Sequence, residues 1–252
     1  MSFQEGNFSI TIQSSLTPIH YYLLKWIALM TMLTDHIAIC FLEENSSPYI
    51  VMRTIGRLAF PLFCFSLVES FWFTKDRKRH FFRLAMIMLI SEIPFNLMER
   101  GTLFAPDYQN VCVTLCIGYI SLWLCNLEVT QKWKPVLRMS YCILIGSIFA
   151  ILNQLLQADY YWNGIVLILL LDFSKKRNRK VLFQIVALMI FAFFTENMYC
   201  MIAVLDVLFF NYDFGLSDKE IMKKVIKNQT MKRFCSIFYP LHLFVLYFCK
   251  LN

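Results

Sequence analysis

The chain has 252 residues, of which 58% are hydrophobic, 17% aromatic and 16% charged, and its net charge is +7. Soluble globular domains carry about 25% charged residues, so the composition excludes an ordinary water-soluble protein and leaves no length for a separate soluble domain. The basic residues fall between apolar segments, which favours a role in membrane topology over nucleic-acid binding.

The cysteines are also informative. There are nine, an odd number, and nearly all lie within apolar runs, which argues against a disulfide framework. Cys112 and Cys116 share a helical face, but no histidine or further cysteine pair near them completes a zinc site. We therefore predict no metal site.

Apolar runs separated by charged breaks predict an all-α polytopic bundle of about nine transmembrane helices, with eight to ten as the range. Residues 1–18 are a polar segment without a basic region, so the first apolar run is expected to be a retained helix rather than a signal peptide. The predicted spans are Tyr21–Leu42, Ile50–Phe73, Phe81–Leu97, Val111–Leu127, Val136–Leu156, Tyr160–Phe173, Val181–Thr195, Met198–Phe210 and Phe234–Lys250. The sixth to eighth are short for a hydrocarbon core about 30 Å thick, so tilted, re-entrant or buried helices are all open for them.

The loops predict the orientation of the chain. Those after even-numbered spans hold most of the 24 Lys and Arg residues, whereas those after odd-numbered spans hold Arg100 and several acidic residues. The positive-inside rule then predicts a multi-pass cell-membrane protein with its N-terminus in the cytoplasm and its C-terminus outside. Residues 1–252 are expected to form a single integral membrane domain, with residues 213–232 as an amphipathic segment on the inner surface.

Polar residues from helices far apart in sequence fall at one depth, in the outer half of the predicted membrane. They are His36 with its neighbour Asp35, Arg53, Arg57, Glu92, Asn96, Thr114, Asn153 and Asn163, with Asp206 and His242 nearer the midplane. The inner half is predicted to hold few polar residues buried in the membrane, because Lys25 and Arg83 can snorkel and Glu69 lies near the end of its helix.

Ionisable side chains in hydrocarbon need a partner or a wet cavity. One interpretation of the layer is therefore an ion-pair network, such as Asp35–Arg57 and Glu92–Arg53, that only holds the bundle together. The asymmetry between the two halves favours the other interpretation, a functional site open to the outside.

Several stretches in this layer resemble the TraX family, whose namesake N-acetylates the pilin subunit of a conjugative plasmid. The stretches are Lys25-Trp26-Ile27-Ala28-Leu29 leading to Asp35-His36, Arg53-x-x-Gly56-Arg57-Leu58-Ala59-Phe60-Pro61-Leu62-Phe63, Ser91-Glu92-Ile93-Pro94-Phe95-Asn96, Gln109-Asn110-Val111 with Thr114, and Tyr239-Pro240-Leu241-His242. The second stretch is the most specific. The resemblance covers the whole membrane part and implies an acyltransferase, with acetyl-CoA as donor and an amine on a pilin-like or other exported polypeptide as acceptor.

Amine acetylation needs a base for the attacking nitrogen and a donor for the tetrahedral oxyanion. We predict His36 as the base, because histidine titrates near neutral pH. Asp35 points about 100° away on an ideal helix, so it is expected to pair with an arginine. Arg53 or Arg57 would stabilise the oxyanion or hold a carboxylate or phosphate.

Other residues of the layer have open roles. Glu92 could bind the ammonium of the substrate or fix an arginine, and His242 could be a second base or an acyl-histidine relay. Asn96, Asn110, Thr114 and Asn153, together with Arg53, are predicted to contact substrate. The inner basic residues Lys175–Lys180 could bind the phosphates of CoA, although topology alone explains their charge.

Two other functions use the same residues. A small anion transporter would bind its cargo at the arginines, with Pro61, Pro94 and Pro240 breaking helices. A non-catalytic scaffold of a conjugation or secretion assembly would tolerate changes at His36 and Arg57. The predicted partners are the lipid bilayer and an exported peptide.

Overall fold

The computed structural model describes residues 18–175, 180–195 and 229–251. Within these ranges the regular secondary structure is helical and the helices are joined by loops, two of which meet in a backbone bridge between Gln109 and Ala158; this confirms the all-α class. The helices are α1 Pro18–Phe41, α2 Ser47–Gly56, α3 Ala59–Phe73, α4 Arg77–Arg100, α5 Val111–Cys125, α6 Glu128–Gln131, α7 Pro135–Leu155, α8 Tyr161–Lys175, α9 Lys180–Phe194 and α12 Gln229–Leu251.

Five segments of the described chain are long and apolar enough to cross a membrane. They are Leu23–Phe41, Ser47–Phe73, Arg77–Arg100, Pro135–Leu155 and Arg233–Leu251, and two shorter apolar helices are Val111–Cys125 and Val181–Phe194. The count of about nine transmembrane helices therefore stays a prediction beyond these five long segments and two shorter helices. Helices α5, α8 and α9 have 15 residues each, which is about 22 Å of helix against a core of about 30 Å.

Two predicted segments fall largely outside the described residues. The span Met198–Phe210 does so completely. Of the predicted amphipathic segment 213–232, only the last four residues are described, and they form the first turn of α12.

The second predicted span is interrupted in its middle. Helix α2 ends at Gly56, and α3 begins at Ala59. Pro61 has no N–H to donate to the carbonyl of Arg57, and its ring crowds that carbonyl, so the helix breaks four residues before the proline. The Leu58 N–H instead bonds the carbonyl of Ile55 at 3.2 Å, a tighter turn. The break leaves Arg57 between two helices.

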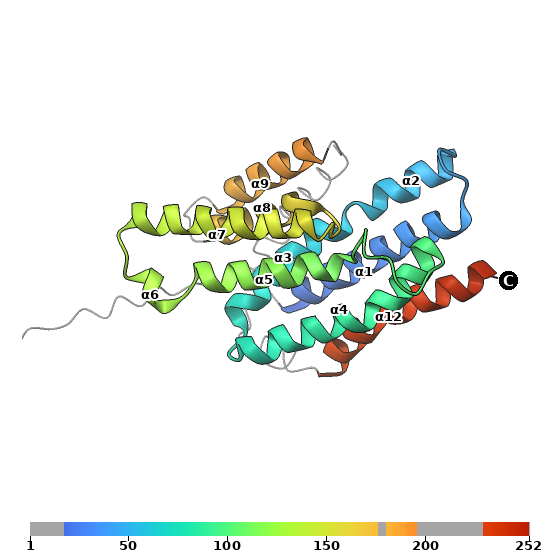
Figure 1. The fold of residues 1–252 in the computed structure, drawn as a ribbon, viewed down its shortest axis with the longest axis horizontal. Helices are drawn as coiled ribbons and strands as arrows, with labels where there is room; N and C mark the ends of the chain where they lie inside the picture. The colour runs from blue at the N-terminus through green and yellow to red at the C-terminus, as the bar shows by residue number, and fades with distance from the viewer. Residues whose placement is uncertain (1–17, 176–179, 196–228, 252) are drawn as a thin grey trace, which may run out of the picture.

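Successive spans from α1 through α2–α3, α4, α5, α7 and α8 to α9 run in alternate directions, which divides the bundle into two ends (Figure 1). We call the end with loops 42–46, 101–110 and 156–160 the acidic end, and the end with loops 74–76 and 126–134 the basic end. Helix α1 starts at the basic end and α12 finishes at the acidic end (Figure 1). This relative arrangement agrees with the predicted topology, while the orientation in the membrane stays a prediction.

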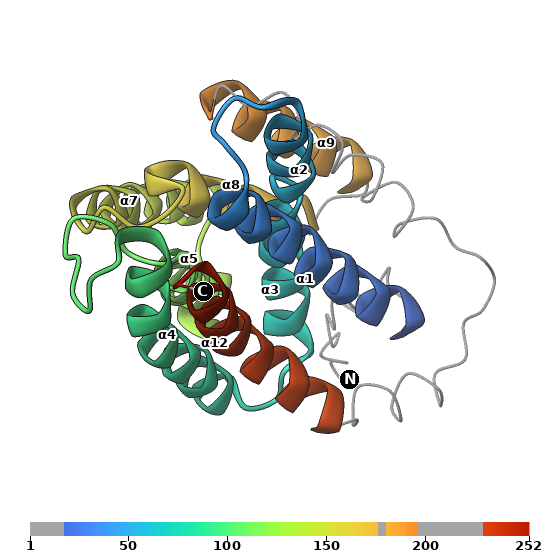
Figure 2. The same cartoon turned by 90° about the vertical axis from the view of Figure 1, so that its right-hand side faces the viewer.

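The interior is built from two main apolar clusters. One joins α1, α3, α5, α8 and α9 around Phe60, Tyr119 and Leu167. The other joins α1, α3, α4, α5 and α12 around Phe95, Tyr239 and Leu243. Viewed from the acidic end, α1 lies between α2 and α12, while α7 lies at the periphery (Figure 2). The second cluster therefore brings the C-terminal helix against the first one.

Candidate functional site

The two histidines of the polar layer meet across the α1–α12 contact. His36 Nδ1 lies 2.8 Å from His242 Nε2, although 206 positions separate them in the chain. On its other side, His242 Nδ1 lies 2.8 Å from the carbonyl oxygen of Phe238, one turn earlier in α12. The rings of His36 and His242 are nearly parallel, at an angle of 9°.

These contacts assign the tautomers of both rings. A carbonyl oxygen only accepts, so His242 Nδ1 carries a hydrogen and donates it to Phe238. In the neutral ring, His242 Nε2 is then an acceptor, and His36 Nδ1 donates to it. His36 Nε2 is left with its lone pair. The arrangement therefore presents His36 as a base and uses both nitrogens of His242 for positioning.

Asp35 and Arg53 form the ion pair next to this dyad. Arg53 Nη1 donates to Asp35 Oδ2 at 2.5 Å, and both side chains are partly buried. Arg53 also lies within electrostatic range of His36. The predicted pairing of Glu92 with Arg53 is therefore wrong, and Asp35 bonds Arg53 while Arg57 lies within its electrostatic range. The last turn of α2 presents Arg53 toward α1, whereas Arg57 follows the helix end.

Arg57 faces the loop between α7 and α8. The charges of Asp35 and Asp159 and the hydroxyl of Tyr160 surround its guanidinium. The Tyr160 ring stacks on Phe60 at a centroid distance of 3.8 Å, which fixes the tyrosine beside the helix break. Arg57 is thus held by residues from three parts of the chain.

Glu92 and Asn96 lie one turn apart on α4, facing the start of α5. The Asn110 side-chain amide donates to Glu92 Oε2, while Asn110 Oδ1 accepts the N–H of Cys112 and caps α5. Asn96 is buried and donates weakly to the carbonyl of Leu103 at 3.5 Å. Asn110 is therefore committed to the helix cap and to Glu92.

Thr114 and Asn153 tie α5, α7 and α8 together. The Thr114 hydroxyl donates to the carbonyl of Asp159 at 2.5 Å and accepts the Asn153 amide at 3.1 Å. The same amide also donates to the carbonyl of Tyr161. Both side chains are fully buried. Their contacts are with the protein itself, and their predicted role in substrate binding stays a prediction.

The two loops at the acidic end are joined by backbone hydrogen bonds. The Gln109 N–H donates to the carbonyl of Gln157 at 3.2 Å, and the Asp159 N–H donates to the carbonyl of Gln109 at 3.1 Å. Gln157, Tyr160 and Tyr161 all have positive φ, at 51°, 62° and 45°. Left-handed backbone is uncommon for such side chains and persists only where surrounding contacts enforce it.

Tyr108 and Asp159 complete this junction. The Tyr108 hydroxyl donates to Asp159 Oδ1 at 3.0 Å. Burial raises the pKa of Tyr108 well above its usual value, and the Asp159 charge raises it further, so the hydroxyl stays a donor. Burial also raises the pKa of Asp159, while the Tyr108 hydrogen bond and the Arg57 charge oppose that shift.

The sequence did not single out Tyr108, Asp159, Tyr160 or Tyr239 as site residues. The first three lie in loops, where no periodicity indicates their direction, and their role depends on contacts with distant segments. Tyr239 lies in the Tyr239–His242 stretch, which did offer a signal. Its ring is 5.7 Å from the His242 ring, and its hydroxyl is within electrostatic range of Glu92 and Asp159.

The basic half contains a buried polar cluster that the sequence interpretation missed. Lys175 pairs with Glu69 at 2.6 Å, with side-chain exposures of 6% and 3%. Asp172 accepts from the Trp72 indole at 2.7 Å and from the Asn126 amide at 3.0 Å. The prediction that this half holds few buried polar residues is therefore wrong. Because Lys175 is enclosed and paired, it is a poor candidate for CoA phosphates, and residues 176–179 lie outside the described chain.

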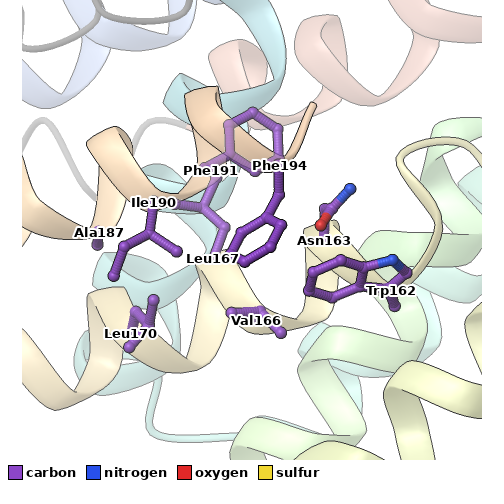
Figure 3. Close-up of a pocket in the computed structure, with 9 residues that line it drawn as sticks. All are labelled: Trp162, Asn163, Val166, Leu167, Leu170, Ala187, Ile190, Phe191 and Phe194. Atoms are coloured by element: carbon purple, nitrogen blue, oxygen red, sulfur yellow. The ribbon is translucent and has the colours of Figure 1, made fainter. Parts of the chain in front are cut away.

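An apolar crevice between α8 and α9 is also visible (Figure 3). Its lining residues are Trp162, Asn163, Val166, Leu167, Leu170, Ala187, Ile190, Phe191 and Phe194. Asn163 is the one amide among these apolar side chains, so the crevice lacks the acid, base and cation that the dyad region combines. Asp206, also predicted in the layer, lies outside the described residues.

Within the described ranges, no three histidine, cysteine, aspartate or glutamate side chains converge in a way that could hold a metal ion. The chemistry available around the histidine dyad is therefore that of a base, carboxylates and guanidinium groups. This set suits proton transfer and the stabilisation of an oxyanion.

Comparison with known proteins places these residues in a family. A curated relative, the probable fimbrial assembly protein FimC, serogroup H1, of Dichelobacter nodosus, is 31% identical over 149 residues. The match spans 55% of this chain and 61% of that protein, so it covers less than two thirds of the relative. No solved structure matches the chain. A family model described as TraX protein matches residues 21–250, which contain every site residue named above. The chain therefore belongs to the TraX family.

Proposed function

We propose that this protein is a membrane-embedded N-acetyltransferase that transfers acetyl from acetyl-CoA to an amine, such as the N-terminal amine of a pilin-like or other exported polypeptide. Family membership supports this proposal, since TraX is associated with pilin acetylation. The name of the FimC relative points toward pilus assembly. The observation that carries the proposal is the His36–His242 contact at 2.8 Å beside the Arg53–Asp35 pair.

In this mechanism His36 Nε2 accepts the proton of the attacking amine as the nitrogen bonds to the acetyl carbon. The same proton is then delivered to the sulfur as the carbon–sulfur bond breaks, which yields the amide and the free thiol. His242 accepts the Nδ1 hydrogen of His36 and stabilises the imidazolium that forms between the two steps. His36 Nδ1 donates to His242, and His242 in turn donates to the Phe238 carbonyl. Because Nδ1 of His36 is used in this chain, its basic Nε2 is directed away from His242.

His242 is assigned a positioning role instead of a covalent one. An acyl-histidine relay needs a ring nitrogen with an available lone pair. Both nitrogens of His242 are engaged, one with Phe238 and one with His36. His36 therefore fits the role of base better than His242 does.

Arg53 is the candidate for oxyanion stabilisation, because its charge reaches His36. Asp35 holds Arg53 through one guanidinium nitrogen, which leaves further donors on the group. Arg57, held by Tyr160 and Asp159, is the candidate for binding a carboxylate or phosphate of a substrate.

The test is transfer of labelled acetyl from acetyl-CoA in membranes that contain the protein and co-expressed small exported peptides. We expect His36→Ala to lose about 10²- to 10⁴-fold in rate, the usual contribution of a general base. His242→Ala should reduce the rate as well. His80→Ala is the matched control, because His80 lies in the first turn of α4 at the basic end and should leave transfer intact.

Two results would overturn the assignment. One is full transfer in both the His36→Ala and His242→Ala proteins. The other is no label in the wild type when protein and acceptor are both present at measured amounts.

An anion transporter is the second candidate, supported by one specific observation. The α2–α3 span is discontinuous, and Arg57 lies at the break, as in transporters that bind substrate at broken helices. Counterflow of a labelled anion in proteoliposomes, without any covalent product, would support transport. A scaffold is the remaining alternative, and it predicts that His36→Ala and Arg57→Ala proteins that fold keep full biological function.

A further inference from the structure

Glu92 is a carboxylate in a membrane-spanning helix with no basic partner in the described chain. The ion pairs there join Asp35 to Arg53, Asp107 to Arg100 and Glu69 to Lys175. Sequence analysis left two roles open for Glu92, to fix an arginine or to bind an ammonium. The first role is not seen, because Glu92 contacts the Asn110 amide instead.

The environment of Glu92 is held rigidly. The Asn110 amide that donates to Glu92 Oε2 also donates to the carbonyl of Met88 at 3.3 Å. The Asn110 carbonyl oxygen accepts the Cys112 N–H at 2.8 Å. The start of α5 thus fixes Glu92 Oε2, and the Asn110 N–H and the Asn96 side chain also direct hydrogen-bond donors toward the carboxylate.

Two buried oxygen atoms near this point accept no hydrogen bond within the described ranges. They are Glu92 Oε1 and Asn96 Oδ1. Asn96 is 2% exposed, and its side chain lies close to Glu92 on the same face of α4. Leaving such acceptors without a donor in a low-dielectric interior costs free energy. The pair therefore presents two hydrogen-bond acceptors, one of them on a carboxylate, at one face of α4.

A primary ammonium group fits these acceptors. It carries one positive charge and three N–H donors, and it accepts nothing. Its charge would pair with Glu92, and two of its hydrogens would meet Glu92 Oε1 and Asn96 Oδ1.

Tyr239 connects this position to the histidine dyad. Its hydroxyl lies within electrostatic range of Glu92, and its ring is 5.7 Å from the His242 ring. Tyr239 therefore links the surroundings of Glu92 to those of the histidine dyad.

We propose that Glu92 and Asn96 form a subsite that binds a primary ammonium group of the acceptor substrate. The role in acceptor binding rests on the proposed function, whereas the binding of an ammonium ligand does not. The subsite selects cationic acceptors by supplying a carboxylate that neutral amides, alcohols and esters cannot satisfy.

The experiment measures thermal unfolding of the full-length protein in detergent, with n-hexylammonium chloride as probe. Hexan-1-ol and hexyltrimethylammonium chloride are the comparison ligands, since the first lacks charge and the second lacks N–H donors. We expect hexylammonium to raise Tm in a saturable way, with clearly smaller shifts for the other two. Glu92→Gln should weaken hexylammonium binding by about 10- to 100-fold, the usual cost of losing a charged hydrogen bond.

Asn96→Ala is the second variant, in case Glu92→Gln does not fold, and it should weaken binding to a smaller extent. Glu44→Gln is the matched control, because Glu44 is exposed in the loop after α1, and it should bind the probe like the wild type. Equal stabilisation by hexan-1-ol, or unchanged hexylammonium binding in folded Glu92→Gln or Asn96→Ala, would overturn the proposal. So would stabilisation by Ca²⁺ or Mg²⁺ in place of the ammonium.

A kinetic measurement links the subsite to acetyl transfer. Glu92→Gln should raise KM for the acceptor peptide and leave kcat much closer to that of the wild type, because a binding group acts before the chemical step. Hexylammonium binding without any acetyl transfer would refute the proposed function while leaving the ammonium site intact. Acetyl transfer without ammonium binding would refute the site alone.

Discussion

Replacing Gly56 by alanine tests the contact between α1 and α2 that holds Asp35 against Arg53. A Cβ at position 56 would lie 2.1 Å from Asp35 Oδ1, 2.3 Å from its Cβ and 2.5 Å from its Cγ. All three distances are far below van der Waals contact, so Asp35 or the whole of α1 must move.

The expected cost follows from the crowding and from the ion pair. Overpacking of a filled interior costs about 1–3 kcal/mol. The Asp35–Arg53 pair is only partly buried, so its loss adds less than the figure for a fully buried pair. We expect Gly56→Ala to lower the free energy of unfolding by about 2–4 kcal/mol and to reduce acetyl transfer, because Arg53 loses its anchor.

The assay is thermal unfolding in detergent, followed by tryptophan fluorescence, with acetyl transfer measured on the same preparations. Gly146→Ala is the matched control, because a Cβ there meets only the Cδ1 end of Leu169 at 2.8 Å, which can rotate away. The decisive comparison is with Asp35→Gly, which removes the Cβ as well as the carboxylate of Asp35. If Asp35 is the obstacle, Gly56→Ala should cost little in the Asp35→Gly background. An undiminished cost there would refute the reasoning.

Two further predictions concern stability. Lys175→Met should destabilise the protein by about 3–5 kcal/mol, because it leaves Glu69 buried without its cation, whereas adding Glu69→Leu to it should recover most of that loss in the same unfolding assay. Asn153→Ala should cost about 1–3 kcal/mol, because its amide bonds both Thr114 and the carbonyl of Tyr161; an unchanged Tm would show that these bonds do not hold α7 to α8.

The helices themselves were predictable, because hydropathy and charged breaks are local properties of the chain. The ends of α1, α5 and α7 fall within a few residues of the predicted ones. A break at Pro61 was expected only under the transporter interpretation, together with breaks at Pro94 and Pro240, which instead lie inside α4 and α12. The break at Arg57 depends on Pro61 acting on a carbonyl four residues earlier within an otherwise continuous apolar run. The short α6 was not predicted, since four residues carry no periodic pattern.

The sequence indicated several residues of the polar layer better than it indicated which of them bond to each other. Arg53 and Arg57 lie one turn apart, so spacing alone could not decide which of them meets Asp35. The structure decides it, because the helix ends at Gly56 and directs Arg57 toward Tyr160 and Asp159.

The buried cluster at the basic end was missed for a related reason. Glu69 and Lys175 each lie near a helix end, where a charged residue is ordinarily free to reach water. Their helices pack so that the two side chains face each other inside the bundle.

The sequence by itself determined that this is a helical chain with several apolar segments able to span a membrane, and which family it resembles. These are properties of composition, hydropathy and motif, and they need no knowledge of packing. Only the tertiary structure decided that His36 bonds His242, that Arg53 takes Asp35 and that Glu92 has no basic partner in the described chain. Each of these depends on how far a helix is rotated about its own axis, and the apolar cluster around Phe95, Tyr239 and Leu243 sets that rotation for α1, α4 and α12 together.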